Sequence, residues 1–412
     1  MLIAAASGRA LAASARRAGF MPLVADAFGD QDTLAAAACH VRVDLLDRPV
    51  DAGKLIAALD ALARARDPAG IVCGSGFEDR ADLLARIAQR WTLLGNGADT
   101  VARIKDPSAF AALCRAASIP HPETSLTPPA DRAGWLTKRA GGAGGLHVRP
   151  ADNSCGVKPA TDPHRIPPPF RGREKLAASS FLPLKGGGIR RGSSTDQPRS
   201  FIDSPEYYFQ RRVAGEPVSA LMLGDGSRAM VLGFSAQWSS PTPRHPFRYG
   251  GAVRPAALDE NMKQAMTAAL QRLVALVPLV GMNSADFLVD GDAFHLLEVN
   301  PRPGASFDLF EPEACSLFAL HLDACAGKLP PQAPAFTDAM AGAIVYAEHD
   351  IAAVPAMDWP EWTADRPVAG SRINAGGPLC SVFARAATAQ EAKALVGRRV
   401  AQVPAMLGAR LP

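Results

Sequence analysis

Residues 282–311 read MNSADFLVDGDAFHLLEVNPRPGASFDLFE, and this stretch decides the fold prediction. Two apolar runs, 285–289 and 293–299, flank Asp290-Gly291-Asp292, which is typical of a tight hairpin turn. Because side chains alternate between the two faces of a strand, Leu296, Glu298 and Asn300 are expected to share one face. The stretch therefore predicts a β-hairpin that presents an acid and an amide on the same side.

Three oxygen-bearing side chains of this hairpin are candidate ligands of a metal ion, those of Asp286, Glu298 and Asn300. Carboxylate and amide oxygens, without thiolate or imidazole, suit a hard cation that keeps some waters and binds phosphates, which is Mg²⁺. Arg302 follows, and its planar, permanently charged guanidinium can hold a phosphoryl or carboxylate group. For Glu298 alone, the alternative is a solvated position at the edge of a sheet.

The sequence Glu-Val-Asn-Pro-Arg-Pro-Gly over 298–304, with Asp-Phe twelve residues before it, resembles the metal-binding end of the ATP-grasp superfamily. This resemblance implies an α/β (α+β) ATP-grasp fold and an enzyme that joins a carboxylate to an amine with ATP. It also implies that Asp286, Glu298 and Asn300 hold Mg²⁺ or Mn²⁺ and that Arg302 is catalytic.

A lysine before a glycine-rich loop lies at 138–145, as the resemblance requires. Glycine lets backbone N–H groups approach a polyphosphate without obstruction by side chains. The loop matches neither a Rossmann fingerprint nor a P-loop. By the resemblance, Lys138 is catalytic and binds phosphate, and Lys105 is a second phosphate contact, with an exposed lysine before a helix as the alternative for Lys105. The loop glycines assigned to the nucleotide are Gly141, Gly142, Gly144 and Gly145.

The segment 207–219 is expected to be the strand and hinge that hold the adenine. By the resemblance, main-chain groups near its middle bind the base, those of Arg211, Arg212 and Val213. Gln210 stands where many relatives have Glu. Glu216 is the candidate for the ribose hydroxyls, although relatives often have that Glu one position later. An edge strand that ends in a turn is the plain alternative.

Residues 1–90 alternate strand-like and helix-like patterns, which is typical of a doubly wound, Rossmann-like α/β domain. Ligands of such sheets lie beyond the carboxyl ends of the strands, which points to 7–9, Asp26 and 74–78. Because no fingerprint glycines precede Asp26, a structural role is favoured for it. Glu78 is expected to face either an acceptor amine or the start of a helix, where acids are favoured.

The length of 412 residues suits several domains, and we expect a pre-ATP-grasp domain at 1–100, an ATP-grasp domain at 101–330 and a small C-terminal α/β domain at 331–412. The net charge of +4 comes from residues 152–204, which include nine Lys or Arg and five Asp or Glu. This segment is rich in Pro, Gly and Ser and has no sustained period, which predicts a disordered, tolerated insert. No nucleic-acid partner is expected.

Composition indicates a soluble globular protein, with 48% apolar and 20% charged residues. No apolar run reaches the length of a membrane span, the first residues lack a basic region, and the seven cysteines form no C-x-x-C pair. We therefore expect a cytoplasmic protein with small-molecule partners and no membrane attachment, and leave a homodimer open. Cys315, His321 and Cys325 are expected to pack in a helix rather than bind metal.

The motifs at 74–78 and 247–251 and the C-terminal tail resemble the predicted carboligase branch of the superfamily, which includes tyramine–glutamate ligase. The implied reaction forms an acyl phosphate from a small-molecule acid, which an amine then attacks, in synthesis of a methanofuran- or tetrahydromethanopterin-type one-carbon cofactor. Two other classes stay open: an ATP-binding regulatory or scaffold protein without turnover, and a dehydrogenase-like protein that uses the N-terminal domain.

Overall fold

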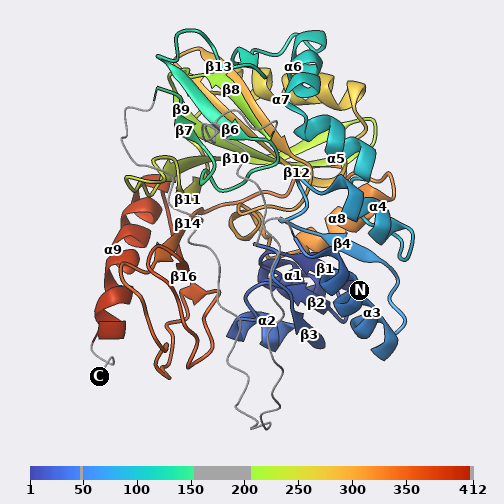
Figure 1. Cartoon of the computed structure of the whole chain (residues 1–412), viewed down its shortest axis with the longest axis vertical. Helices are drawn as coiled ribbons and strands as arrows, with labels where there is room; N and C mark the ends of the chain where they lie inside the picture. Colours follow the sequence, from blue (N-terminus) through green and yellow to red (C-terminus); the bar gives the residue numbers. More distant parts are fainter. Residues whose placement is uncertain (47–49, 153–205, 409–412) are drawn as a thin grey trace, which may run out of the picture.

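The computed structural model describes residues 1–46, 50–152 and 206–408. Its described strands form three sheets in a mixed α/β architecture, which confirms the predicted fold class (Figure 1). The segment predicted to be an insert, 152–204, lies outside the described residues apart from Asp152. The domain bounds near 100 and 330 stay predictions.

The N-terminal part is a parallel sheet with the strand order β3-β2-β1-β4. Each strand is followed by a helix, as the sequence pattern predicts. Asp26 is fully buried at the end of β2 and accepts hydrogen bonds from the N–H groups of Gly8 (3.0 Å) and Gly29 (2.9 Å), a structural role as favoured above. The elements are β1 (Leu2–Ala5), α1 (Arg9–Arg17), β2 (Leu23–Asp26), α2 (Gln31–Ala36), β3 (Cys39–Arg42), α3 (Ala52–Ala65), β4 (Ile71–Cys73) and α4 (Ala81–Ala88).

A second, small antiparallel sheet has the order β5-β8-β6-β7 and contains the predicted lysine strand and adenine strand as neighbours. Two helices lead from the N-terminal part into it, α5 (Ala98–Lys105) and α6 (Pro107–Ala116). Its strands are β5 (Thr124–Ser125), β6 (Trp135–Arg139), β7 (Arg149–Pro150) and β8 (Tyr207–Arg211).

The largest sheet is antiparallel and eight-stranded, in the order β13-β12-β9-β10-β11-β14-β16-β15. Its strands are β9 (Glu216–Asp225), β10 (Ala229–Ser239), β11 (Tyr249–Arg254), β12 (Val280–Asp290), β13 (Ala293–Asn300), β14 (Ala339–Tyr346), β15 (Thr363–Ala364) and β16 (Pro378–Ala386). The accompanying helices are α7 (Glu260–Leu276), the 3₁₀ helix η2 (Asp308–Phe310), α8 (Leu317–Cys325) and α9 (Ala389–Gly408). The C-terminal strands β14 to β16 extend this sheet from β11, and α9 packs on them (Figure 1).

The two faces of the large sheet have different neighbours. On one face, Ala220 and Met222 of β9 pack with side chains of α6 and α7. On the other face, Leu221 and Leu223 pack with side chains of α1 and α8. Residues paired across strands share a face, and Asp286 of β12 pairs with Ser219 of β9, two positions beyond Leu221. Polar side chains thus replace apolar ones on the second face at this end of the sheet.

The predicted hairpin forms between β12 and β13, but its register contains a bulge. Asp286 pairs with Glu298, whereas the next residue, Phe287, pairs with Leu296, so that Leu297 is the extra residue. Leu296 consequently lies with Phe287 in the apolar core on the opposite face. The prediction that Leu296 shares the face of Glu298 is wrong, because the bulge interrupts the alternation.

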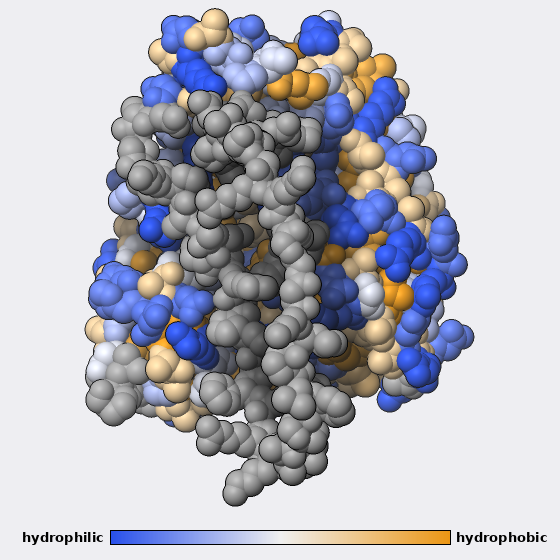
Figure 2. Space-filling view, viewed as in Figure 1, coloured by the Kyte–Doolittle hydropathy of each residue, from blue (hydrophilic) through white to orange (hydrophobic). Residues whose placement is uncertain are grey.

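The visible surface carries hydrophilic and apolar side chains side by side. On the face seen in Figure 2, hydrophilic side chains predominate on both coloured flanks and apolar ones are scattered among them. Within the described ranges, no helix is both long and apolar enough to cross a bilayer.

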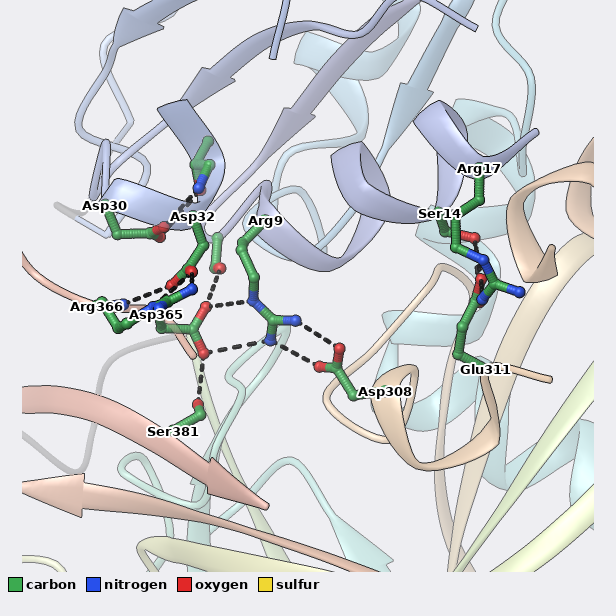
Figure 3. A network of polar contacts seen from close by, with 12 residues as sticks. Arg9, Ser14, Arg17, Asp30, Asp32, Asp308, Glu311, Asp365, Arg366 and Ser381 are labelled. Carbon is green, nitrogen blue, oxygen red and sulfur yellow. Dashed lines mark hydrogen bonds and ion pairs between the residues drawn. The ribbon is translucent and has the colours of Figure 1, made fainter. Parts of the chain in front are cut away.

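A buried arginine ties three distant segments together (Figure 3). Arg9, at the start of α1, donates to both carboxylate oxygens of Asp308 in η2 (2.5 and 2.7 Å). It also donates to Asp365, which follows β15 (2.9 Å), and Ser381 of β16 donates to the same carboxylate (2.5 Å). Beside it, Arg366 pairs with Asp32 of α2. The N-terminal part is thereby fastened to η2 and to the β15–β16 edge of the large sheet.

Asp30, at the N-cap of α2 beside this network, makes stability depend on pH. Burial and the nearby Asp365 raise its pKa from 3.8 to about 6, although hydrogen bonds from Thr33 oppose the shift. The folded state therefore binds this proton more tightly than the unfolded state, and stability falls as pH rises from about 4 to about 6. Asp30→Asn is expected to be more stable than wild type by about 1–3 kcal/mol at pH 8, with the difference shrinking towards pH 4, in urea unfolding.

The control for this prediction is Asp51→Asn, at the exposed N-cap of α3, whose pKa is lowered by hydrogen bonds from Lys54. Asparagine also caps helices well, so neither substitution removes the cap itself. Relative to wild type, the free energy of unfolding should increase between pH 4 and pH 8 for Asp30→Asn but not for Asp51→Asn. Parallel pH profiles for Asp30→Asn and wild type would contradict the argument.

Candidate functional site

The three predicted metal ligands lie together on the second face of the large sheet. Asp286 and Glu298 are direct partners across β12 and β13, and Asn300 is the partner of Ser284 on the same face. The side-chain nitrogen of Asn300 donates to Asp286 Oδ2 at 3.1 Å. Gln237 of β10 lies on the other side of Asp286, with its Nε2 3.4 Å from Oδ1.

The two facing carboxylates repel each other. Burial and the charge of Glu298 raise the pKa of Asp286 above its ordinary value. Burial also opposes ionisation of Glu298, but Lys105 and Lys138 outweigh it and hold the pKa of Glu298 low. A divalent cation between the carboxylates would relieve the repulsion, so the oxygen donors fit Mg²⁺.

Histidine and cysteine do not add to this donor set. Over the residues that the structure describes, no group of three His, Cys, Asp or Glu side chains could hold a metal ion. His321 accepts a hydrogen bond from the Met282 N–H at Nδ1 (2.8 Å), so its Nε2 donates to the Leu94 carbonyl (3.0 Å). Cys325 packs in α8 with its Sγ 3.7 Å from His321 Nε2, whereas Cys315 lies before the N-cap residue Ser316, so the prediction that Cys315 is in this helix is wrong. A cation held by Asp286, Glu298 and Asn300 would keep some of its waters, as expected for Mg²⁺.

Both predicted lysines point into the site. Lys105, the last residue of α5, donates to Asn300 Oδ1 (2.7 Å) and lies 3.7 Å from Glu298 Oε2. Its side chain is only 8% exposed, so the alternative of an exposed lysine is wrong. Lys138 of β6 donates to Gln210 Oε1 (3.0 Å); burial disfavours its charge, but Tyr208 and Glu298 raise its pKa overall. Two ammonium groups therefore flank Glu298.

Arg302 is held by Glu78 from the N-terminal part. Glu78 Oε1 accepts from Arg302 Nε at 2.7 Å, and Oε2 accepts from the Gly76 N–H at 2.8 Å. Burial opposes ionisation of Glu78, but Arg302 and Lys105 lower its pKa to about 2. The Glu78 side chain is 1% exposed, and the N-cap of α4 is Arg80, so the expectation that Glu78 lies at a helix start is wrong. Glu78 positions Arg302, and its role towards an acceptor amine stays a prediction.

The glycine-rich loop packs closely against its surroundings. A Cβ on Gly145 would lie 1.8 Å from the Phe247 carbonyl oxygen, and one on Gly141 would lie 2.6 Å from the Asp79 side chain. Both glycines have positive φ, as has Gly144, whose carbonyl accepts from the Tyr249 N–H at 3.0 Å. Packing is therefore sufficient by itself to require glycine at positions 141 and 145. The phosphate contacts of the loop stay a prediction.

The predicted adenine hinge follows β8. The N–H groups of Arg211 and Arg212 donate to the carbonyls of Glu123 and Gly134, both at 2.8 Å. At these two residues only the backbone carbonyl oxygens can therefore contact a base. The backbone N–H of the next residue, Val213, is the candidate donor. Gln210 is buried against Lys138, and Glu216 is exposed at the start of β9. The nucleotide-binding roles of these residues stay predictions.

Sequence reasoning missed three neighbours of the site: Tyr208, Gln237 and His147. Tyr208 pairs with Lys138 across β8 and β6. It lies two positions before Gln210, so strand alternation was a sufficient signal. Gln237 comes from β10, which is separated from the hairpin strand β12 by β9, and no local sequence signal places it near Asp286. His147 lies within the glycine-rich loop itself.

A family model and several solved structures resemble this chain. Residues 183–306 match the family model of the ATP-grasp domain, a match that ends just after Arg302. No curated protein sequence matches the chain.

Solved structures share the fold over nearly the whole chain. Biotin carboxylase from Campylobacter jejuni is 14% identical with a TM-score of 0.67, covering 96% of this chain and 89% of that one. N5-carboxyaminoimidazole ribonucleotide synthetase from Thermus thermophilus is 14% identical with a TM-score of 0.65, covering 98% of both chains. L-amino acid ligase from Bacillus licheniformis is 14% identical with a TM-score of 0.63, covering 97% of this chain and 96% of that one. These likenesses establish the fold.

Proposed function

We propose that this chain, which has the ATP-grasp fold, is an ATP-dependent ligase that joins a small-molecule carboxylate to an amine. The observation that carries the proposal is the convergence of Asp286, Glu298 and Asn300 with three cationic side chains, those of Lys105, Lys138 and Arg302. Oxygen ligands beside a cluster of cations suit a metal-bound polyphosphate. The match of the ATP-grasp family model and the structural relatives support the same class.

Each group then has a role in positioning charge. Asp286, Glu298 and Asn300 would hold Mg²⁺, or Mn²⁺, which neutralises the terminal phosphates of ATP. Lys105 and Lys138 would orient those phosphates, so that a substrate carboxylate lies in line with the γ-phosphorus. Arg302, fixed by Glu78, would stabilise negative charge that develops at the acyl centre.

Two displacements complete the proposed reaction. A carboxylate oxygen bonds to the γ-phosphorus as the bond from that phosphorus to the β,γ-bridging oxygen breaks, giving an acyl phosphate and ADP. The amine nitrogen then bonds to the acyl carbon as the bond from carbon to the phosphate oxygen breaks, and the amine loses a proton. Inorganic phosphate and an amide are the remaining products.

The nature of the substrates is a finer proposal. The motifs at 74–78 and 247–251 resemble the branch that includes tyramine–glutamate ligase, and one structural relative is an L-amino acid ligase. We therefore expect an amino acid or a related acid as one substrate, in one-carbon cofactor biosynthesis in the cytoplasm. A homodimer stays part of this proposal.

The test is release of ADP from Mg²⁺-ATP in the presence of pooled carboxylates crossed with pooled amines, including glutamate with tyramine-like amines. Release that requires both pools is expected, and division of the pools then names the acid and the amine. Tight ATP binding without release in any pool would instead favour the regulatory or scaffold protein. Binding of a nicotinamide nucleotide in place of ATP would favour the dehydrogenase-like protein.

A further inference from the structure

His147, which follows the loop glycines, has a ring nitrogen, Nδ1, that is not used by its protein neighbours. Within the part of the chain that the structure describes, Nδ1 is buried and has no hydrogen-bond partner. Buried side-chain nitrogens nearly always have a partner in folded proteins. An imidazole left in this state is therefore a candidate for contact with a bound molecule.

Gly142 fixes where the ring lies. A Cβ on Gly142 would lie 2.2 Å from His147 Cγ and 2.5 Å from Nδ1, so the ring rests directly on the backbone of the loop. The Gly142 N–H donates to the Arg139 carbonyl at 3.2 Å, which holds this part of the loop to the end of β6. Any side chain at position 142 would push the ring away.

The charges around the ring select the kind of partner. Burial lowers the pKa of His147 to about 4, while Glu298 opposes and Lys138 and Lys105 reinforce the shift. The imidazole is therefore neutral at pH 7 and has one N–H to donate. The charged groups that act on the ring include the two lysines and the carboxylate at the proposed metal position. An oxygen-rich anion held by the same lysines is the partner that fits this N–H.

We propose that His147 donates a hydrogen bond to the terminal phosphate of the bound nucleoside triphosphate. This inference rests on the proposed function, in which Glu298 and the lysines hold that end of the nucleotide. His147 thereby distinguishes a triphosphate from a diphosphate.

Nucleotide binding measured by calorimetry tests this role without turnover. His147→Leu is expected to weaken binding of the Mg²⁺ complex of AMP-PNP, a slowly hydrolysed ATP analogue, about tenfold, as for loss of one hydrogen bond to a charged group. Binding of Mg²⁺-ADP should change less than about twofold, because it lacks the phosphate that His147 contacts. His147→Gln, which keeps a donor, should lose less. Gly142→Ala should reproduce the selective loss with the imidazole still present.

The matched control is Leu146→Ala, which alters the preceding, exposed residue of the same loop and should leave both affinities unchanged. Equal weakening of both nucleotides by His147→Leu would show a role in loop shape only and overturn the inference. Unchanged AMP-PNP binding would overturn it as well. A wild-type protein that binds neither nucleotide would overturn both the proposed function and this inference. If only the inference about His147 is wrong, the wild-type protein still binds both nucleotides.

Discussion

Glu298→Gln is expected to lower ADP release at least about a hundredfold. The substitution keeps the size of the side chain but removes one of the two facing carboxylates of the site and the negative charge beside Lys105. A hundredfold loss corresponds to about 2.7 kcal/mol of the activation free energy, a reasonable effect for loss of a charged metal ligand. Turnover at saturating ATP, and nucleotide affinity measured across Mg²⁺ concentrations, check the prediction.

Loss of Glu298 should also change its neighbour. With the charge of Glu298 gone, the repulsion that raises the pKa of Asp286 is relieved. A cation then has less repulsion to neutralise and one carboxylate fewer to bind, so half-maximal activity should require a higher Mg²⁺ concentration. Asp292→Asn, in the exposed turn of the same hairpin, is the control and should keep wild-type turnover. Activity of Glu298→Gln close to wild type would remove the site from the position proposed here.

The hairpin and the N-terminal sheet were predictable because their signals are local. A turn sequence between two apolar runs fixes the pairing of β12 with β13, and the alternation of strand and helix fixes the N-terminal sheet. The bulge at Leu297 was not predictable, because the pattern of apolar residues in β13 suits an unbroken alternation equally well. The bulge places Leu296 in the core and leaves Glu298 facing Asp286.

The contacts between distant segments were the least predictable part of the site. Glu78 and Arg302 are separated by 224 positions, and each has a plausible local role in its own motif. Only the packing of the N-terminal sheet against the large sheet shows that the two charges are partners. Burial of an unpaired carboxylate is costly, so a nearly inaccessible Glu78 requires a cation from elsewhere in the chain. The same holds for Arg9 with Asp308 and Asp365.

The glycine-rich loop illustrates a different limit of sequence reasoning. Its glycines were assigned to phosphate binding, and the structure gives two of them, Gly141 and Gly145, a packing reason as well. A sequence cannot separate the two causes, because both require a residue without a Cβ. The Nδ1 atom of His147 is a more direct sign of a bound molecule, because it is buried without a hydrogen-bond partner.

Arg302→Lys is expected to lower kcat about a hundredfold with little change in nucleotide affinity. Lysine keeps the positive charge that Glu78 requires, so the fold is preserved, but it is a point charge without the planar fork of donors. Removal of one donor that stabilises developing charge typically costs about 10²–10³ in kcat. Single-turnover rates with Mg²⁺-ATP and both substrates, beside calorimetric nucleotide affinities, separate chemistry from binding.

Glu78→Gln tests the same role from the other side of the ion pair. Glutamine can still accept from the Gly76 N–H, but it no longer holds the guanidinium by charge, so Arg302 is retained and loses its fixed direction. We expect an intermediate loss in kcat, smaller than that of Arg302→Lys, and a double variant no worse than Arg302→Lys alone, because Glu78 acts through Arg302. Arg385→Lys, in a half-exposed ion pair outside the site, should leave kcat unchanged. Additive losses in the double variant would mean that Glu78 acts independently of Arg302, and an unaffected Arg302→Lys would exclude Arg302 from the chemical step.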